Sequence, residues 1–138
     1  MTKNVWLLTI VLVVLIAGGI GYTWLRYYKS EQLHQTLAKM AVELNKNNPK
    51  TLDADTRLDK VTSSNERFIY SYTLMNTVSG KVNFDTLAPK LKSEFAKRLC
   101  TTKGWNTLLE DGAQVEYFYS GSDGKPIGRV MITSSDCK

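Results

Sequence analysis

The chain has 138 residues, with 18 Lys and Arg against 13 Asp and Glu and a formal net charge of +5. This length allows one small domain plus an appendage, because single domains run to about 100–150 residues. The one histidine and two cysteines lie at separations that match no zinc-ligand spacing. The basic residues are interspersed with acidic ones, so we predict no nucleic-acid surface.

The first element is an uncharged run, Val5–Leu25, dominated by Leu, Val and Ile. At a helical rise of 1.5 Å per residue it spans about 31 Å, which matches the hydrocarbon core of a bilayer. It is longer than the apolar region of a signal peptide. We therefore predict a single-pass transmembrane anchor over residues 1–29, with bilayer lipid as a partner. Aromatic residues are expected at its two interfaces: Trp6, Tyr22, Trp24, Tyr27 and Tyr28.

Residues 30–48 are predicted to form an amphipathic helix. Nothing between Leu25 and Ser30 breaks a helix, so the anchor is expected to continue into it, and Asn48-Pro49 ends it. The stripe packs either on its own domain or on a helix of a partner. Its apolar residues recur at three- and four-residue spacing: Leu33, Leu37, Met40 and Leu44.

Residues 49–138 are predicted to form a globular domain that begins with a hairpin. A polar strand, Thr56–Thr62, is followed by a strongly alternating one, Arg67–Asn76, with polar turn residues at 63–66. Phe68, Tyr70, Tyr72 and Leu74 share one face of the second strand.

Two helices and a second hairpin complete the domain. The spacing of apolar residues predicts a helix over Phe84–Leu99 and a short one that Thr102 caps and Gly112 ends. The last two strands centre on Val115–Tyr119 and Ile127–Thr133, joined by a glycine-rich turn. The predicted fold class is α+β, an antiparallel sheet of about four strands, in two hairpins, covered by helices.

The two cysteines indicate the cellular compartment in which the domain lies. Cys100 ends a predicted helix and Cys137 lies at the chain's end, so a disulfide in an oxidising compartment is one interpretation. Two unrelated reduced thiols are the alternative. Positive charges after the anchor, including Arg26 and Lys29, favour a cytoplasmic domain instead. We favour the domain outside the cytoplasm, because a short N-terminal tail is easily retained inside.

The sequence predicts no catalytic, cofactor or metal site. His34, the only histidine, has no nucleophile or acid arranged around it. Asp53, Asp55 and Asp59 hint at calcium ligation but lack the glycine and distant glutamate of an EF-hand loop. Capping and solvation of a loop explain these acids better.

Four tyrosines on two predicted strands form a candidate partner surface, since half-polar aromatic rings suit protein contacts. They are Tyr70, Tyr72, Tyr117 and Tyr119. The alternative is that these rings lie on the core face of the sheet, beneath the helices.

The stretch from Thr51 to Cys137 resembles a family of small bacterial envelope domains with paired cysteines. The motifs that carry the resemblance are Asp55–Asp59, Tyr70–Leu74, Cys100 with Leu108-Leu109-x-x-Gly112, Tyr117-x-Tyr119, Asp123-Gly124 and Asp136-Cys137. The arrangement is also similar to the pilot proteins of type II secretion, which help secretin subunits through the envelope. This chain differs from them in having a transmembrane anchor in place of a lipidated cysteine. The resemblance implies a periplasmic fold with a disulfide and no enzymatic activity.

Three functions follow as hypotheses. The leading one is a non-enzymatic accessory module at the bacterial inner membrane, with a periplasmic domain that contacts another envelope protein. The second is immunity or exclusion against a toxin or a conjugation system. The third is a sensor of a small ligand or lipid, which requires an apolar cavity between sheet and helices.

Overall fold

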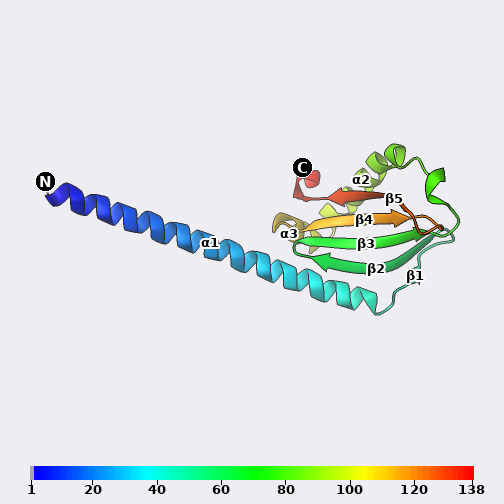
Figure 1. Cartoon of the computed structure of the whole chain (residues 1–138), viewed down its shortest axis with the longest axis horizontal. Coiled ribbons are helices and arrows are strands. Elements are labelled where there is room, and N and C mark those ends of the chain that lie inside the picture. Colours follow the sequence, from blue (N-terminus) through cyan, green and yellow to red (C-terminus); the bar gives the residue numbers. More distant parts are fainter. Residues whose placement is uncertain (1) are drawn as a thin grey trace.

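The computed structural model describes residues 2–138, with side chains from Trp6 onward. The side chains of Lys3 and Val5, at the start of the predicted span, lie outside the described part. A long N-terminal helix leads into a five-stranded sheet with helices packed against it (Figure 1). This arrangement confirms the α+β fold class.

Helix α1 runs without a break over Thr2–Asn45. The described side chains up to Lys29 are exposed, and this part of α1 projects away from the domain (Figure 1). From Ser30 onward α1 packs along the sheet, so the apolar stripe lies on the chain's own domain. Its membership differs from the prediction, because Ala41 is buried in place of Leu44 and Met40 is half-buried. Leu44 is 42% exposed, and the fully packed residues are Leu33, Leu37 and Ala41.

The sheet has the strand order β1-β2-β3-β4-β5. The strand β1 has only two polar residues, which leave no periodic signal in the sequence. Both predicted hairpins are present, as antiparallel pairs β2–β3 and β4–β5. The bounds are Lys50–Thr51 for β1, Thr56–Ser64 for β2, Arg67–Leu74 for β3, Gln114–Ser120 for β4 and Pro126–Ile132 for β5.

The two hairpins meet through a parallel pair, β3 with β4, so the prediction of a wholly antiparallel sheet is wrong at this junction. The connection between these strands contains α2 (Phe84–Thr101) and α3 (Trp105–Glu110). A crossover of this length carries the chain back along the sheet, so β4 starts beside the start of β3.

The turn after α2 also differs from the prediction. Thr102 does not cap α3, since its hydroxyl donates to the Arg98 carbonyl oxygen at the end of α2. Gly104 occupies the N-cap position of α3 with a φ of 96°, a left-handed angle that favours glycine.

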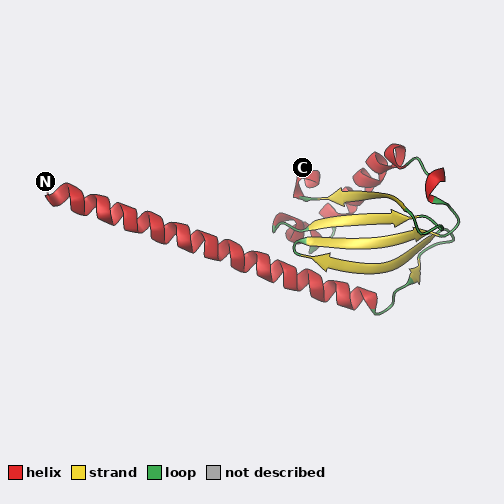
Figure 2. Ribbon diagram, in the orientation of Figure 1, coloured by secondary structure: helices red, strands yellow, loops and turns green. Residues whose placement is uncertain are grey.

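The helices bury one face of the sheet in two clusters. Leu37 of α1 packs with Val61 and Phe68, while Leu99 of α2 packs with Val115. Figure 2 shows α2 and α3 behind the sheet and no helix in front of it.

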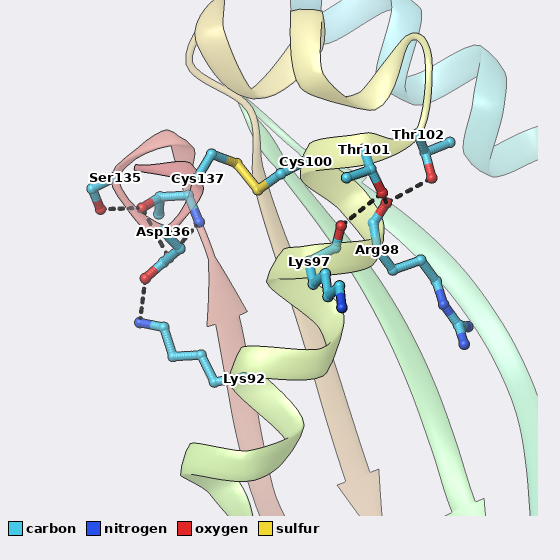
Figure 3. The surroundings of a disulfide bond; sticks show 10 residues. Lys92, Lys97, Arg98, Cys100, Thr101, Thr102, Ser135, Asp136 and Cys137 are labelled. Atoms are coloured by element: carbon cyan, nitrogen blue, oxygen red, sulfur yellow. Dashed lines mark hydrogen bonds and ion pairs between the residues drawn. A yellow bond between two sulfur atoms is a disulfide. The ribbon is translucent and has the colours of Figure 1, made fainter.

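The predicted disulfide is confirmed. Cys100, near the end of α2, is bonded to Cys137, with a Cα–Cα distance of 5.5 Å. Beside it, the ammonium group of Lys92 lies 2.9 Å from Asp136, whose carboxylate also accepts the Thr133 backbone N–H (Figure 3). The C-terminal tail is thus held against α2 by a covalent bond and an ion pair.

Candidate functional site

An apolar groove of about 410 Å³ lies between α2 and the sheet. The sheet supplies tyrosines, α2 supplies one apolar wall, and the segment around β1 supplies the other. We call this the tyrosine groove. The lining residues used below are Leu52, Asp53, Tyr72, Leu87, Leu91, Phe95, Arg98, Tyr117 and Tyr119.

The strand register brings the predicted tyrosine set together. In the parallel pair, Tyr70 lies beside Tyr117 and Tyr72 beside Tyr119, all on the helix-covered face. The ring centroids of each pair are 5.3 Å apart and the rings are stacked. Phe95 of α2 stacks on Tyr117 at 4.1 Å. Such cross-strand aromatic pairs fix the register and give the groove a rigid aromatic side.

The tyrosine hydroxyls are polar groups in an apolar setting. Within the described residues, none of the four hydroxyls has a hydrogen-bond partner, and none is fully shielded from solvent. Burial raises the pKa of Tyr70 and Tyr72 to about 12, and raises the pKa of Tyr117 and Tyr119 further. At neutral pH the four phenols are therefore neutral, and three of them, Tyr72, Tyr117 and Tyr119, line the groove, whereas Tyr70 does not.

Two opposite charges stand at the groove. Arg98 of α2 is exposed, and no carboxylate in the described residues lies within salt-bridge distance of its guanidinium. Asp53, which also lines the groove, accepts the backbone N–H groups of Asp55 and Thr56 at 2.9 and 2.7 Å. These bonds, the one from Asp55 foremost, lower the pKa of Asp53, so its carboxylate is charged at neutral pH.

Exposed apolar side chains are few on the domain. Among residues 30–138, five large apolar side chains are exposed, and two of them, Leu52 and Leu87, line the groove. The five are Val42, Leu44, Leu52, Val78 and Leu87. An apolar patch with a polar rim is typical of a binding surface.

The acids that hinted at calcium serve the fold instead. Asp53 holds a turn, and Asp59 accepts hydrogen bonds from Arg57 and Thr73, both at 2.6 Å. In the part of the chain described, no three His, Cys, Asp or Glu side chains cluster as metal ligands would. His34 Nδ1 lies 3.2 Å from the Asn65 carbonyl oxygen, where α1 meets the β2–β3 turn.

The aromatic residues expected at the membrane interfaces lie exposed along α1. Trp24 and Tyr28 stack with ring centroids 5.8 Å apart, and the Arg26 guanidinium lies 5.7 Å from the Tyr22 ring centroid. Contact of these side chains with lipid stays a prediction, and the same holds for Trp6 and Tyr27.

Sequence reasoning missed two parts of the groove. Arg98 is one of the charged residues of α2, although its spacing of three from Phe95 and seven from Leu91 places it on the helix face that lines the groove. Leu52 stands alone in a polar segment, with no periodic signal. Leu87 did carry a signal, since it belongs to the apolar face of the predicted helix.

Comparisons with known proteins agree with this fold. The family model described as "Putative quorum-sensing-regulated virulence factor" matches residues 27–138. A putative secreted protein from Pseudomonas aeruginosa is similar at 19% identity and a TM-score of 0.69, over 80% of this chain and 96% of that one. No curated protein matches the chain.

Two type II secretion pilotins share the fold. EpsS from Vibrio vulnificus has 18% identity and a TM-score of 0.65, over 80% of this chain and 96% of its own. AspS from Vibrio cholerae has 13% identity and a TM-score of 0.59, over 80% of this chain and 97% of its own.

Proposed function

Because the chain belongs to the family described as "Putative quorum-sensing-regulated virulence factor" and shares the pilotin fold, we propose a non-enzymatic accessory role at the bacterial inner membrane. In this proposal α1 anchors a periplasmic domain, and the domain binds an apolar segment of another envelope protein. The observation that carries it is the tyrosine groove, with exposed Leu52 and Leu87 beside unpaired phenol groups.

The contacts available in the groove suit a protein segment. Its apolar walls supply burial of aliphatic side chains, at about 25 cal/mol per Å² removed from water. Tyr72 and Tyr117 supply donors for backbone carbonyls, and Arg98 supplies an unpaired cation. Aromatic and arginine side chains are also the residues that dominate binding energy in protein interfaces.

The position of the groove also favours a protein partner over lipid of the anchoring bilayer. The segment around β1 follows the end of α1 at Asn45, twenty residues beyond Leu25. In an upright helix this is roughly 30 Å from the end of the predicted span. A partner would therefore contact the groove well above the membrane surface.

The side of the membrane on which the domain lies is tested by a reporter fusion and by the oxidation state of the two cysteines. The Cys100–Cys137 disulfide supports an oxidising compartment. A reporter enzyme active only outside the cytoplasm, fused after Lys138, should be active, and reductant should change the electrophoretic mobility of the chain. An inactive fusion with free thiols would contradict the periplasmic placement.

A second candidate function is binding of a small apolar ligand. The groove volume of about 410 Å³ lies within the range of small-molecule sites. In this case the groove would be filled without any protein complex, and its variants would leave cross-linking patterns unchanged.

Cross-linking of the full chain in native membranes separates the two candidates. We expect a discrete adduct that Leu87→Asp abolishes, because a carboxylate placed in the groove opposes burial of an apolar segment. Val42→Asp is the matched control, since Val42 is 67% exposed on α1 and does not line the groove. Equal adduct yields from both variants would contradict the groove as the binding site.

A further inference from the structure

A second hollow, of about 470 Å³, lies where α1 meets the β2–β3 turn and the end of α3. Helix α1 lines it with Arg26 and Lys29, and the β2–β3 turn lines it with Glu66. The end of α3 supplies Glu110 and Asp111. Cations thus stand on the helix side of this hollow and carboxylates on the domain side.

The opposite charges face one another without pairing directly. Within the described residues, neither Arg26 nor Lys29 lies within salt-bridge distance of a carboxylate. Arg26 donates to the Tyr22 hydroxyl at 3.1 Å. Glu66 accepts a hydrogen bond of 2.6 Å from Ser30, which lowers its pKa and keeps it charged. The hollow therefore offers separate positive and negative sites.

The depth of the hollow matches the lipid headgroups. Arg26 directly follows the predicted span, and Lys29 lies about 6 Å beyond Leu25 along the helix. The headgroup layer occupies roughly 5–7 Å on each side of the hydrocarbon core. The hollow thus opens at the level where phosphate and amine groups of the anchoring bilayer lie.

We infer that this hollow binds the zwitterionic headgroup of an aminophospholipid from the anchoring bilayer. The phosphate would meet Arg26 and Lys29, and the primary ammonium would meet Glu110 and Asp111. The inference rests on membrane insertion of α1, which is part of the proposed function.

The charge arrangement defines the lipid class. A phosphatidylethanolamine ammonium donates three hydrogen bonds to carboxylates, whereas the quaternary amine of phosphatidylcholine donates none. Phosphatidylglycerol also satisfies the cations, but its neutral glycerol hydroxyls offer Glu110 and Asp111 no countercharge. The site should therefore prefer phosphatidylethanolamine to both.

The test measures lipid retained by the full chain. The protein is reconstituted into vesicles of equal parts phosphatidylethanolamine, phosphatidylcholine and phosphatidylglycerol, and bound lipids are counted by native mass spectrometry after release. We expect phosphatidylethanolamine to be retained several-fold over the other two. The double variant Glu110→Gln with Asp111→Asn should lower that retention to the level of phosphatidylcholine.

Controls keep the outcomes distinct. The double variant Asp85→Asn with Glu94→Gln, which neutralises two exposed acids on α2, should retain lipid like the unmodified chain. Equal retention of the three lipids, a preference for phosphatidylglycerol, or no effect of the Glu110 and Asp111 changes would overturn the inference alone. Failure of the chain to float with the vesicles would contradict the inference and the proposed anchor together.

Discussion

The Ser30 hydroxyl donates a hydrogen bond of 2.6 Å to Glu66 Oε1, which joins α1 to the β2–β3 turn five residues beyond the end of the predicted span. One turn further along α1, His34 contacts the Asn65 carbonyl oxygen of the same turn. The domain is therefore attached to the helix at the point where the helix leaves the predicted bilayer, with no free linker. Helix tilt and domain orientation are coupled.

Replacing Ser30 by alanine should weaken this attachment. A hydrogen bond of this kind contributes about 1 kcal/mol to stability. The Ser30 hydroxyl is also the foremost cause that lowers the pKa of Glu66 in the folded chain from 4.5. A lowered carboxyl pKa gives stability that is present above about pH 4.5 and is lost as the pH falls through the folded value.

Denaturant unfolding of the full chain in detergent, repeated between neutral pH and pH 3, measures this. Ser30→Ala should lose stability at neutral pH and show a shallower loss on acidification than the unmodified chain. Identical acid profiles for the two proteins would contradict the role of this hydrogen bond.

Leu37→Ala should destabilise the domain by about 2–5 kcal/mol, because it removes a fully buried side chain from the cluster around Phe68. Val42→Ala on the same helix is the control, since Val42 is 67% exposed and its truncation should change stability by less than about 0.5 kcal/mol. Thermal unfolding followed by near-ultraviolet circular dichroism reports both. Equal effects would show that α1 does not belong to the domain core.

Loss of the disulfide should cost more stability than loss of any one surface contact. The bond joins residues 37 apart in sequence, for which the chain-entropy model gives about 4 kcal/mol. The double variant Cys100→Ser with Cys137→Ser should unfold at lower denaturant concentration, and added reductant should have no further effect on it. An unchanged midpoint would contradict a stabilising role.

The raised pKa of Tyr72 makes the groove sensitive to alkali. Its folded pKa is about 12 against an ordinary value of 10, because burial disfavours the phenolate. The unfolded chain releases this proton first, so stability should fall as the pH rises above about 10. The difference in phenolate absorbance between the unmodified chain and Tyr72→Phe should titrate near pH 12. A difference spectrum that titrates near pH 10 would contradict burial of this ring.

Much of this architecture was predictable because it rests on periodicity. Alternation placed Phe68, Tyr70 and Tyr72 on one face of a strand, and three- to four-residue spacing placed Leu33 and Leu37 on one face of a helix. An even pair of cysteines at the ends of predicted elements indicated the disulfide. These features are local or nearly so.

The features that were not predicted depend on contacts between segments that are far apart in the sequence. Two hairpins are compatible with several sheet orders, and the parallel junction of β3 with β4 follows from where α2 and α3 pack. Likewise, the groove forms because α2, which packs on β5, and the segment around β1 both border Tyr72. No local pattern brings Leu52, Arg98 and Tyr72 together.

Site-directed photo-cross-linking from the groove is the most direct measurement of the central claim, that an envelope protein binds there. A photoreactive phenylalanine analogue is placed at Leu87 of the full chain in native membranes, with Val42 as the matched exposed position. The account predicts one adduct of defined mass with an envelope protein from Leu87, and none from Val42. Adducts of equal yield from both positions, or an adduct from Val42 alone, would contradict it.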